Sequence, residues 1–327
     1  MKITVCRLRS GINYKRPLLN ILDSYCFLLQ KYMIEEDHTF GYYNFGFGEA
    51  HRRNPKDVPD ADVLIIPSEN EFHYHIDKYI DPKNLAKSNK AIEDHILPYL
   101  KGKHVIILRS DRGDTEELYR EKTFKGIDCK ISILDETDIP GNVHQLKYWF
   151  IKDYIRHNKF DETRDIRFTY WGTEKRNDDS GVSGDQRHVI LKEIQDGEGR
   201  FNTRFYGRFS RVKRDDKSMT MEELVPTLLK TQFTLCFNWK DPTATTSRYH
   251  EAMACGVIPF VWKDYDSTGE LVKNDWQRVN SVSELHQKML MTDHDTYHQM
   301  CDIQAAYEPL NPKEIFSIFK DKLNALL

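Results

Sequence analysis

Short apolar runs of strand length alternate with longer amphipathic segments along the first half of the chain. The apolar runs lie at 3–8, 61–67, 104–110 and 129–134, and helical patterns at 16–33 and 84–100 separate them. Apolar strands that alternate with helices are typical of a parallel sheet covered on both faces. The first half is therefore predicted to be a doubly wound α/β domain.

The same alternation restarts after a predicted linking helix at 143–155, with strand-like runs at 166–172, 203–207, 233–239 and 256–262. We predict two Rossmann-like domains, residues 1–158 and 159–300. The remaining residues, 301–327, form a helix from Pro312 that packs back on the first domain. The two sheets are expected to face a central cleft, where the carboxyl ends of the strands bind ligands.

Composition narrows the class of protein. The chain has 327 residues, 39% of them hydrophobic, and a net charge of -3, so no global basic field draws it to polyanions. No CxxC pair, signal peptide or run of membrane-spanning length is found, so we expect a cytoplasmic monomer with reduced cysteines and no membrane partner. The six scattered cysteines are Cys6, Cys26, Cys129, Cys236, Cys255 and Cys301.

The segment "TTSRYHEAMACGVIPFVW" (245–262) places Arg248 and Glu251 three residues apart on a short helix, which follows cap-forming hydroxyl residues and ends at Gly256. A guanidinium binds phosphate oxygens bidentately, and a carboxylate accepts hydrogen bonds from the vicinal hydroxyls of a ribose. The pair therefore suits a nucleoside diphosphate sugar. A surface ion pair has the same spacing.

A polar loop follows the strand that ends at Gly172, in "YWGTEKRNDDSGVSGDQRHVILKEI" (170–194). With Gly184 near the start of the next helix and Arg187 inside it, such a loop can bind phosphate through helix N-terminal amides. From the loop alone, an ordinary solvated loop is the simpler explanation.

Two aspartates are candidates on the first domain. Asp111 follows the strand at 104–110 and could deprotonate an acceptor hydroxyl, although Asp114 competes and a helix cap is the simpler role. Asp23, in the first helix, could contact a donor sugar. Basic and aromatic residues interleave at 200–214, which suits either a nucleic-acid backbone or a solvated loop. The histidine pairs lack further ligands, so no protein metal site is predicted.

Five segments together resemble the GT-B-fold glycosyltransferases, in particular the T-even bacteriophage family that glycosylates 5-hydroxymethylcytosine in duplex DNA. They are "TYWGT", "VSGDQRHVILKEI", "RFYG", "RYHEAMAC" and "LRSDRGD". The resemblance implies a UDP-sugar donor, UDP-glucose or UDP-arabinose, with Mg²⁺ or Mn²⁺ as an optional cofactor. It implies double-stranded DNA with a hydroxymethylated pyrimidine as the partner.

The resemblance also implies residue roles. Arg187 and Arg248 meet the diphosphate, Glu251 the ribose, and Gly172, Gly184 and Gly207 line the donor site. Asp111 is the general base and Asp23 lies near the donor sugar. We thus expect an inverting DNA glycosyltransferase. Two alternatives stay open: a GT-B transferase acting on a surface glycan or a small molecule, and a binding protein for nucleotide sugars or DNA without catalysis.

Overall fold

The fold was obtained as a computed structural model. It describes the following residues: 2–7, 27–29, 31–32, 35–36, 42–44, 61–66, 100–109, 128–135, 144–160, 163–173, 183–197, 201–208, 220–237, 246–269, 271–272, 274–293, 297, 300–301, 307 and 309–327.

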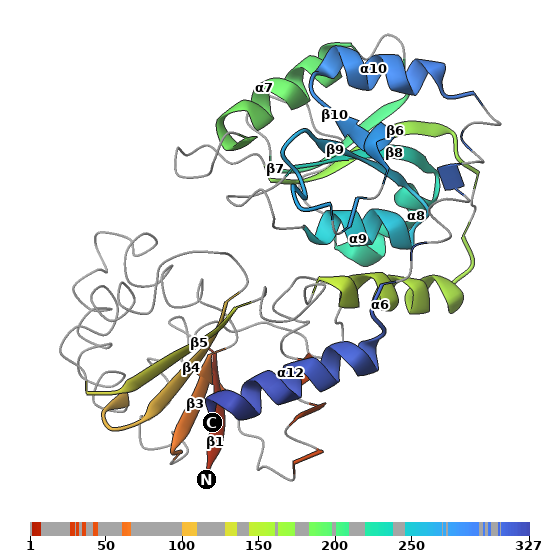
Figure 1. The fold of residues 1–327 in the computed structure, drawn as a ribbon. Coiled ribbons are helices and arrows are strands. Elements are labelled where there is room, and N and C mark those ends of the chain that lie inside the picture. The colour runs from red at the N-terminus through yellow and green to blue at the C-terminus, as the bar shows by residue number, and fades with distance from the viewer. Residues whose placement is uncertain are drawn as a thin grey trace, which may run out of the picture. The chain divides into compact units, whose positions relative to one another are not determined.

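The chain divides into two compact units (Figure 1). The first consists of residues 1–143 together with 313–327, and the second of residues 144–312. The linking helix thus groups with the second unit, and the C-terminal helix groups with the first.

The first unit contains a five-stranded parallel sheet in the order β2-β1-β3-β4-β5. Its buried core comes from the apolar runs of β3 and β4, where Val105 to Leu108 are fully buried. The strands are β1 (Ile3–Arg7), β2 (Tyr42–Asn44), β3 (Val63–Ile66), β4 (His104–Arg109) and β5 (Lys130–Asp135).

The C-terminal helix α12 (Pro312–Leu326) has one apolar face, made of Ile315, Phe316, Phe319 and Leu323, which is buried. Polar contacts complete its packing within the first unit: the hydroxyl of Tyr32 donates to Asn324 Oδ1 at 2.6 Å, and Lys320 pairs with Glu36. Burial of one face of an amphipathic helix accounts for its association with a unit far away in sequence.

The second unit contains a second five-stranded parallel sheet, in the order β10-β9-β8-β6-β7. Fully buried aromatic residues form its core, among them Phe168, Phe233 and Phe260. The strands are β6 (Ile166–Thr173), β7 (Thr203–Arg208), β8 (Thr231–Cys236), β9 (Ile258–Trp262) and β10 (Arg278–Val279).

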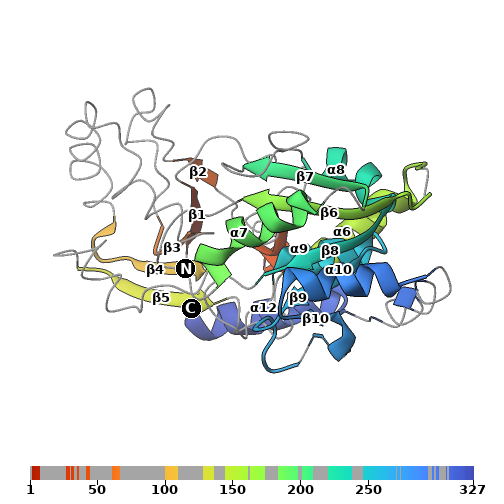
Figure 2. The same cartoon turned by 90° about the horizontal axis from the view of Figure 1, so that it is seen from above.

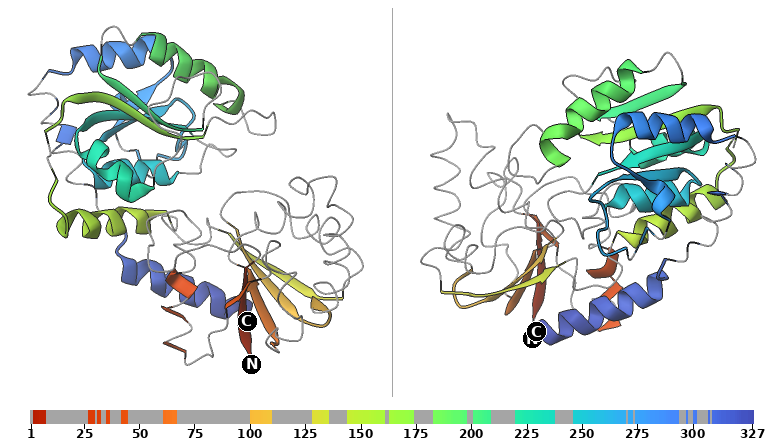
Figure 3. Two further views of the ribbon diagram at one scale, coloured as in Figure 1. Left: turned by 180° about the vertical axis from the view of Figure 1, so that it is seen from behind. Right: turned by 45° about the horizontal axis from the view of Figure 1, so that its top comes forward.

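Helices cover both faces of the second sheet. Figure 1 shows α7 and α10 over one face of the second sheet and α8 and α9 over the other. Figure 2 shows the same helices from above, and Figure 3 gives two further views of the same ribbon. Helix α6 packs against α9. The elements are α6 (Gln145–Arg156), α7 (Ser183–Asp196), α8 (Met221–Leu229), α9 (Ser247–Ala254), the 3₁₀ turn η6 (Asp275–Gln277) and α10 (Val282–Met291).

Both sheets have the same strand order when each is counted from its own first strand: 2-1-3-4-5. In such a sheet the chain winds outward in both directions from strands 1 and 3, so the helices that follow these two strands leave on opposite faces. The crevice between them is where doubly wound folds bind ligands. In the second unit this switch point lies between the ends of β6 and β8.

Candidate functional site

Two glycines lie side by side at the switch point. Gly172 in β6 and Gly207 in β7 are in register, and both have positive φ angles, 140° and 136°. A Cβ on Gly207 would lie 1.8 Å from the carbonyl oxygen of Gly172, so the two strands can approach this closely only without a side chain there.

The absent side chain of Gly172 makes room for Arg248. A Cβ at Gly172 would lie 2.2 Å from Nη2 of Arg248. That Cβ would point to the same face of the sheet as Tyr170, because side chains two residues apart in a strand share a face. The guanidinium of Arg248, which comes from α9, thus reaches across the end of β6 and stacks on the Tyr170 ring, 4.3 Å from its centroid.

Arg187 reaches the same place from α7. Its side chain is buried, and its guanidinium lies 5.2 Å from the centroid of the Phe237 ring. The Phe237 ring packs edge-on against the Tyr170 ring, on which the guanidinium of Arg248 stacks. Two helices on opposite faces therefore bring two guanidinium groups onto two adjoining aromatic rings.

The two cations influence each other. Burial lowers the pKa of Arg187 most, Tyr170 opposes the shift, and the charge of Arg248 lowers the pKa further. Arginine stays protonated even so, and two guanidinium groups held near one another favour an anion with several oxygens, such as a diphosphate.

Glu251 does not form the surface ion pair that its spacing to Arg248 allows. Its side chain is only 6% exposed, and the indole nitrogen of Trp171 donates to its Oε2 at 2.8 Å. Nε of Arg248 donates instead to the backbone carbonyl of Trp171, at 2.7 Å. Among the described residues, Arg248 and Glu251 thus meet through Trp171 rather than directly.

The helix α9 that carries both residues is held at each end. At its start the N–H of Thr246 donates to the buried hydroxyl of Tyr265 at 2.8 Å, and Thr246 itself makes no side-chain cap. At its end Gly256 has a φ of 70°, and the amides of Gly256 and Val257 bond back to Met253 and Ala252. These are the bonds of a Schellman motif.

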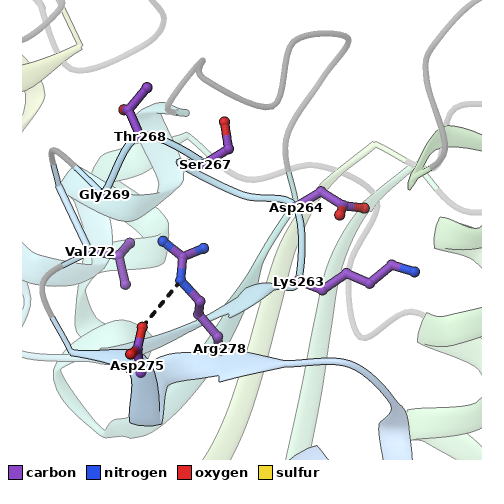
Figure 4. A pocket seen from close by; sticks show the side chains of 8 residues that line it. All are labelled: Lys263, Asp264, Ser267, Thr268, Gly269, Val272, Asp275 and Arg278. Carbon is purple, nitrogen blue, oxygen red and sulfur yellow. Dashed lines mark ion pairs between the residues drawn. The ribbon is translucent and has the colours of Figure 1, made fainter.

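A pocket of about 460 Å³ lies after β9 (Figure 4). The guanidinium of Arg278 lines it but already donates to the carbonyls of Tyr265 and Asp266 and lies 3.8 Å from Asp275. Neither Arg187 nor Arg248 lines this pocket, so the pocket is separate from the place where the two guanidinium groups meet. The full lining is Lys263, Asp264, Ser267, Thr268, Gly269, Val272, Asp275 and Arg278.

The remaining candidates fall in other places. Gly184 belongs to the first turn of α7. Asp111 and Asp23 lie outside the described residues.

Within the described ranges, no three or more histidine, cysteine, aspartate or glutamate side chains gather in a way that could hold a metal ion. No helix in these ranges is long and apolar enough to cross a membrane.

Sequence reasoning missed four aromatic residues of the site: Tyr170, Trp171, Phe237 and Tyr265. For Tyr170, Trp171 and Phe237 the only signal was position, since "TYWG" and "CFNW" place aromatic side chains at the ends of two strands of one sheet. Tyr265 lies beyond the end of β9 and gave no such signal. Aromatic residues at strand ends usually belong to the core. Here Tyr170 and Phe237 pack in the core and also contact the two arginines.

Two doubly wound parallel sheets of identical strand order are the architecture of the GT-B glycosyltransferase fold. No family model matches the sequence, and no curated protein matches it either. Solved structures do match, and the predicted fold class is confirmed by them.

Among these is T4 phage BGT in complex with UDP and Mn²⁺, at 15% identity and a TM-score of 0.55, covering 100% of this chain and 97% of that one. Another structure of T4 phage β-glucosyltransferase matches at 14% identity and 0.52, with the same coverage. An α-glucosyltransferase in complex with UDP and a 13-mer DNA containing an HMU base matches at 13% identity and 0.55, covering 100% of both chains. At such identities the likeness establishes the fold.

Proposed function

We propose that this chain is a UDP-sugar-dependent glycosyltransferase that glycosylates the hydroxymethyl group of 5-hydroxymethylcytosine in DNA, with inversion at the anomeric carbon. The sugar is glucose or arabinose. The observation that carries the proposal is the convergence of Arg187 and Arg248 on the switch point, with the buried carboxylate of Glu251 beside them.

The likeness to solved structures supports the choice of donor and acceptor. T4 phage BGT has been solved with UDP-glucose, and the α-glucosyltransferase with UDP and DNA that contains a hydroxymethylated base. Both cover this whole chain. The sequence resemblance points to the same donor and acceptor through the segments around Arg187, Arg248 and Asp111.

In the proposed reaction the arginines bind the diphosphate and Glu251 accepts hydrogen bonds from the ribose. Gly172, Gly184 and Gly207 let the backbone approach the donor closely.

Asp111, which follows β4 in sequence, removes the proton from the hydroxymethyl oxygen as that oxygen attacks the anomeric carbon. The bond from that carbon to the diphosphate breaks, UDP leaves with the electron pair, and the two guanidinium groups stabilise its charge. A single displacement inverts the configuration. Asp23 contacts the donor sugar.

The proposed partner is double-stranded DNA, so the acceptor base must leave the helical stack to reach such a site. Mg²⁺ or Mn²⁺ is an optional addition to the assay. We assign the stabilisation of the leaving group to Arg187 and Arg248, whose guanidinium groups converge on the switch point.

The test is to incubate the protein with duplex DNA that contains 5-hydroxymethylcytosine and with UDP-glucose or UDP-arabinose, then digest the DNA and weigh its nucleosides. A hexose or pentose increment is expected. Asp111→Asn should abolish it, whereas Asp114→Asn, three residues away, should retain it.

Other outcomes separate the alternatives. If UDP-sugar binds and is slowly hydrolysed but no nucleoside gains mass, the DNA acceptor is wrong and a transferase for another acceptor replaces it. If UDP-sugar or DNA binds without any turnover, and Asp111→Asn changes nothing, the chain is a binding protein.

A further inference from the structure

One residue contacts both of the candidate donor-binding side chains of α9. The backbone carbonyl of Trp171 accepts from Arg248 Nε at 2.7 Å, and its indole nitrogen donates to Glu251 Oε2 at 2.8 Å. We propose that Trp171 is a positioning residue that fixes the orientation of the Glu251 carboxylate and thereby sets how strongly the site selects a ribose over a deoxygenated sugar.

The geometry makes the indole the orienting group. Trp171 is 7% exposed and follows Tyr170 in the strand, so its ring points to the α9 face of the sheet while Tyr170 points to the α7 face. Within the described part of the chain, the indole is the one hydrogen-bond donor to the Glu251 side chain. A buried carboxylate bonded by a rigid ring keeps one orientation, which a carboxylate in solvent does not.

The hydrogen bond from the Trp171 indole leaves particular acceptor positions of the Glu251 carboxylate for a ligand. Because Oε2 receives the indole hydrogen, Oε1 and the remaining lone pair of Oε2 are the acceptors that a ribose can use. A site that is built to accept hydrogen bonds from substrate hydroxyls discriminates strongly against an analogue that lacks them. The inference rests on the proposed function, since it takes the ribose of UDP as the ligand of Glu251.

The test is a comparison of UDP with 2′,3′-dideoxy-UDP, which has the same base and diphosphate but neither ribose hydroxyl. Trp171→Phe removes the indole donor but keeps the backbone carbonyl that holds Arg248. We expect UDP affinity to fall by about 10-fold or more, the effect of losing a hydrogen bond to a charged group. Affinity for the dideoxy nucleotide should change little, so the ratio of the two affinities shrinks.

Trp262→Phe is the matched control. Trp262 is a buried tryptophan of β9 in the same sheet, and its indole nitrogen has no hydrogen-bond partner among the residues that the structure describes. This variant also loses a buried indole but should keep the wild-type ratio of affinities. If Trp171→Phe folds and keeps that ratio as well, the inference is wrong while the UDP site stands. If the wild-type protein does not bind UDP at all, the proposed function is wrong and the inference is overturned with it.

A second measurement does not depend on the folding of Trp171→Phe. In wild-type protein with ¹⁵N-labelled tryptophan, the indole signal of Trp171 can be identified as the one that moves in Glu251→Gln. UDP should shift this signal and 2′,3′-dideoxy-UDP should not. An equal shift with both nucleotides, or no shift with either while UDP binds, would overturn the inference.

Discussion

Gly172→Ala tests the central geometry of the site. The new methyl group would lie 2.2 Å from Arg248 Nη2 and 3.4 Å from Cζ, so the guanidinium must move until this distance exceeds 3.0 Å. The side chain cannot do so freely, since Nε is bonded to the carbonyl of Trp171 and the guanidinium stacks on Tyr170. The substitution should therefore displace the guanidinium from the switch point.

The magnitude follows from the contacts that are lost. A Cβ on a residue with a φ of 140°, a conformation that favours glycine, costs roughly 1–3 kcal/mol, and loss of the stacked cation costs roughly 0.5–2 kcal/mol more. The free energy of unfolding should thus fall by roughly 1.5–5 kcal/mol when these are combined. If Arg248 binds the diphosphate through a charge-assisted hydrogen bond, UDP affinity should also fall by about 10- to 150-fold.

Thermal unfolding and isothermal titration with UDP measure the two effects separately. Gly269→Ala is the control, because Gly269 also has a positive φ, 66°, but nothing lies within 4 Å of the added Cβ. It should lose about 1–2 kcal/mol of stability to the strain of the left-handed conformation alone and keep UDP affinity. A folded Gly172→Ala protein that binds UDP as tightly as the wild type would refute the placement of Arg248 at the diphosphate.

Three further predictions concern stability and helix positioning. Gly207→Ala places a Cβ 1.8 Å from the carbonyl oxygen of Gly172, a backbone atom that cannot rotate away. Thermal unfolding should therefore show a larger loss of stability than for Gly172→Ala, and an equal or smaller loss contradicts the close contact between the strands. Burial lowers the pKa of His250 to about 3, so the folded state binds fewer protons than the unfolded state between pH 6.5 and 3. The stability that neutral His250 contributes is therefore fully present above pH 6.5 and decreases as the pH falls, by about 2 kcal/mol at pH 5. His250→Gln should make the free energy of unfolding depend less on pH in this range, and an unchanged dependence contradicts the pKa shift. Tyr265→Phe removes the acceptor for the N–H of Thr246 at the start of α9 and should weaken UDP binding several-fold, while the binding of DNA alone stays the same; unchanged UDP affinity contradicts a role in positioning this helix.

The pattern of apolar runs was sufficient to predict the fold class. Predicted strands at 104–110 and 166–172 are found as β4 and β6, and the predicted C-terminal helix from Pro312 is found as α12. Such strands can be recognised in the sequence as continuous apolar runs, because buried parallel strands are apolar on both faces. The short strands β2 and β10 were not predicted, because two or three residues carry no periodic signal.

Residue types and spacing also identified Arg187, Arg248 and Glu251 as candidates, and the end of a strand identified Gly172. Gly207 was a candidate only through the resemblance of "RFYG" to the glycosyltransferases. Their roles in the reaction stay predictions, as do those of Asp111 and Asp23, which lie outside the described residues. What spacing alone left open was whether Arg248 and Glu251 form an ion pair on an exposed helix. They do not, since Glu251 is buried and bonded to Trp171.

Only the tertiary structure decided which distant residues meet. The register of β6 with β7 brings Gly172 beside Gly207, and the strand order brings the helices after β6 and β8 to opposite sides of one point. Arg248 crosses the strand through the space that Gly172 leaves, and Trp171 links it to Glu251. Local sequence determines strands and helices because their periodicity is local, whereas strand order, register and the contacts between side chains depend on how the whole chain packs.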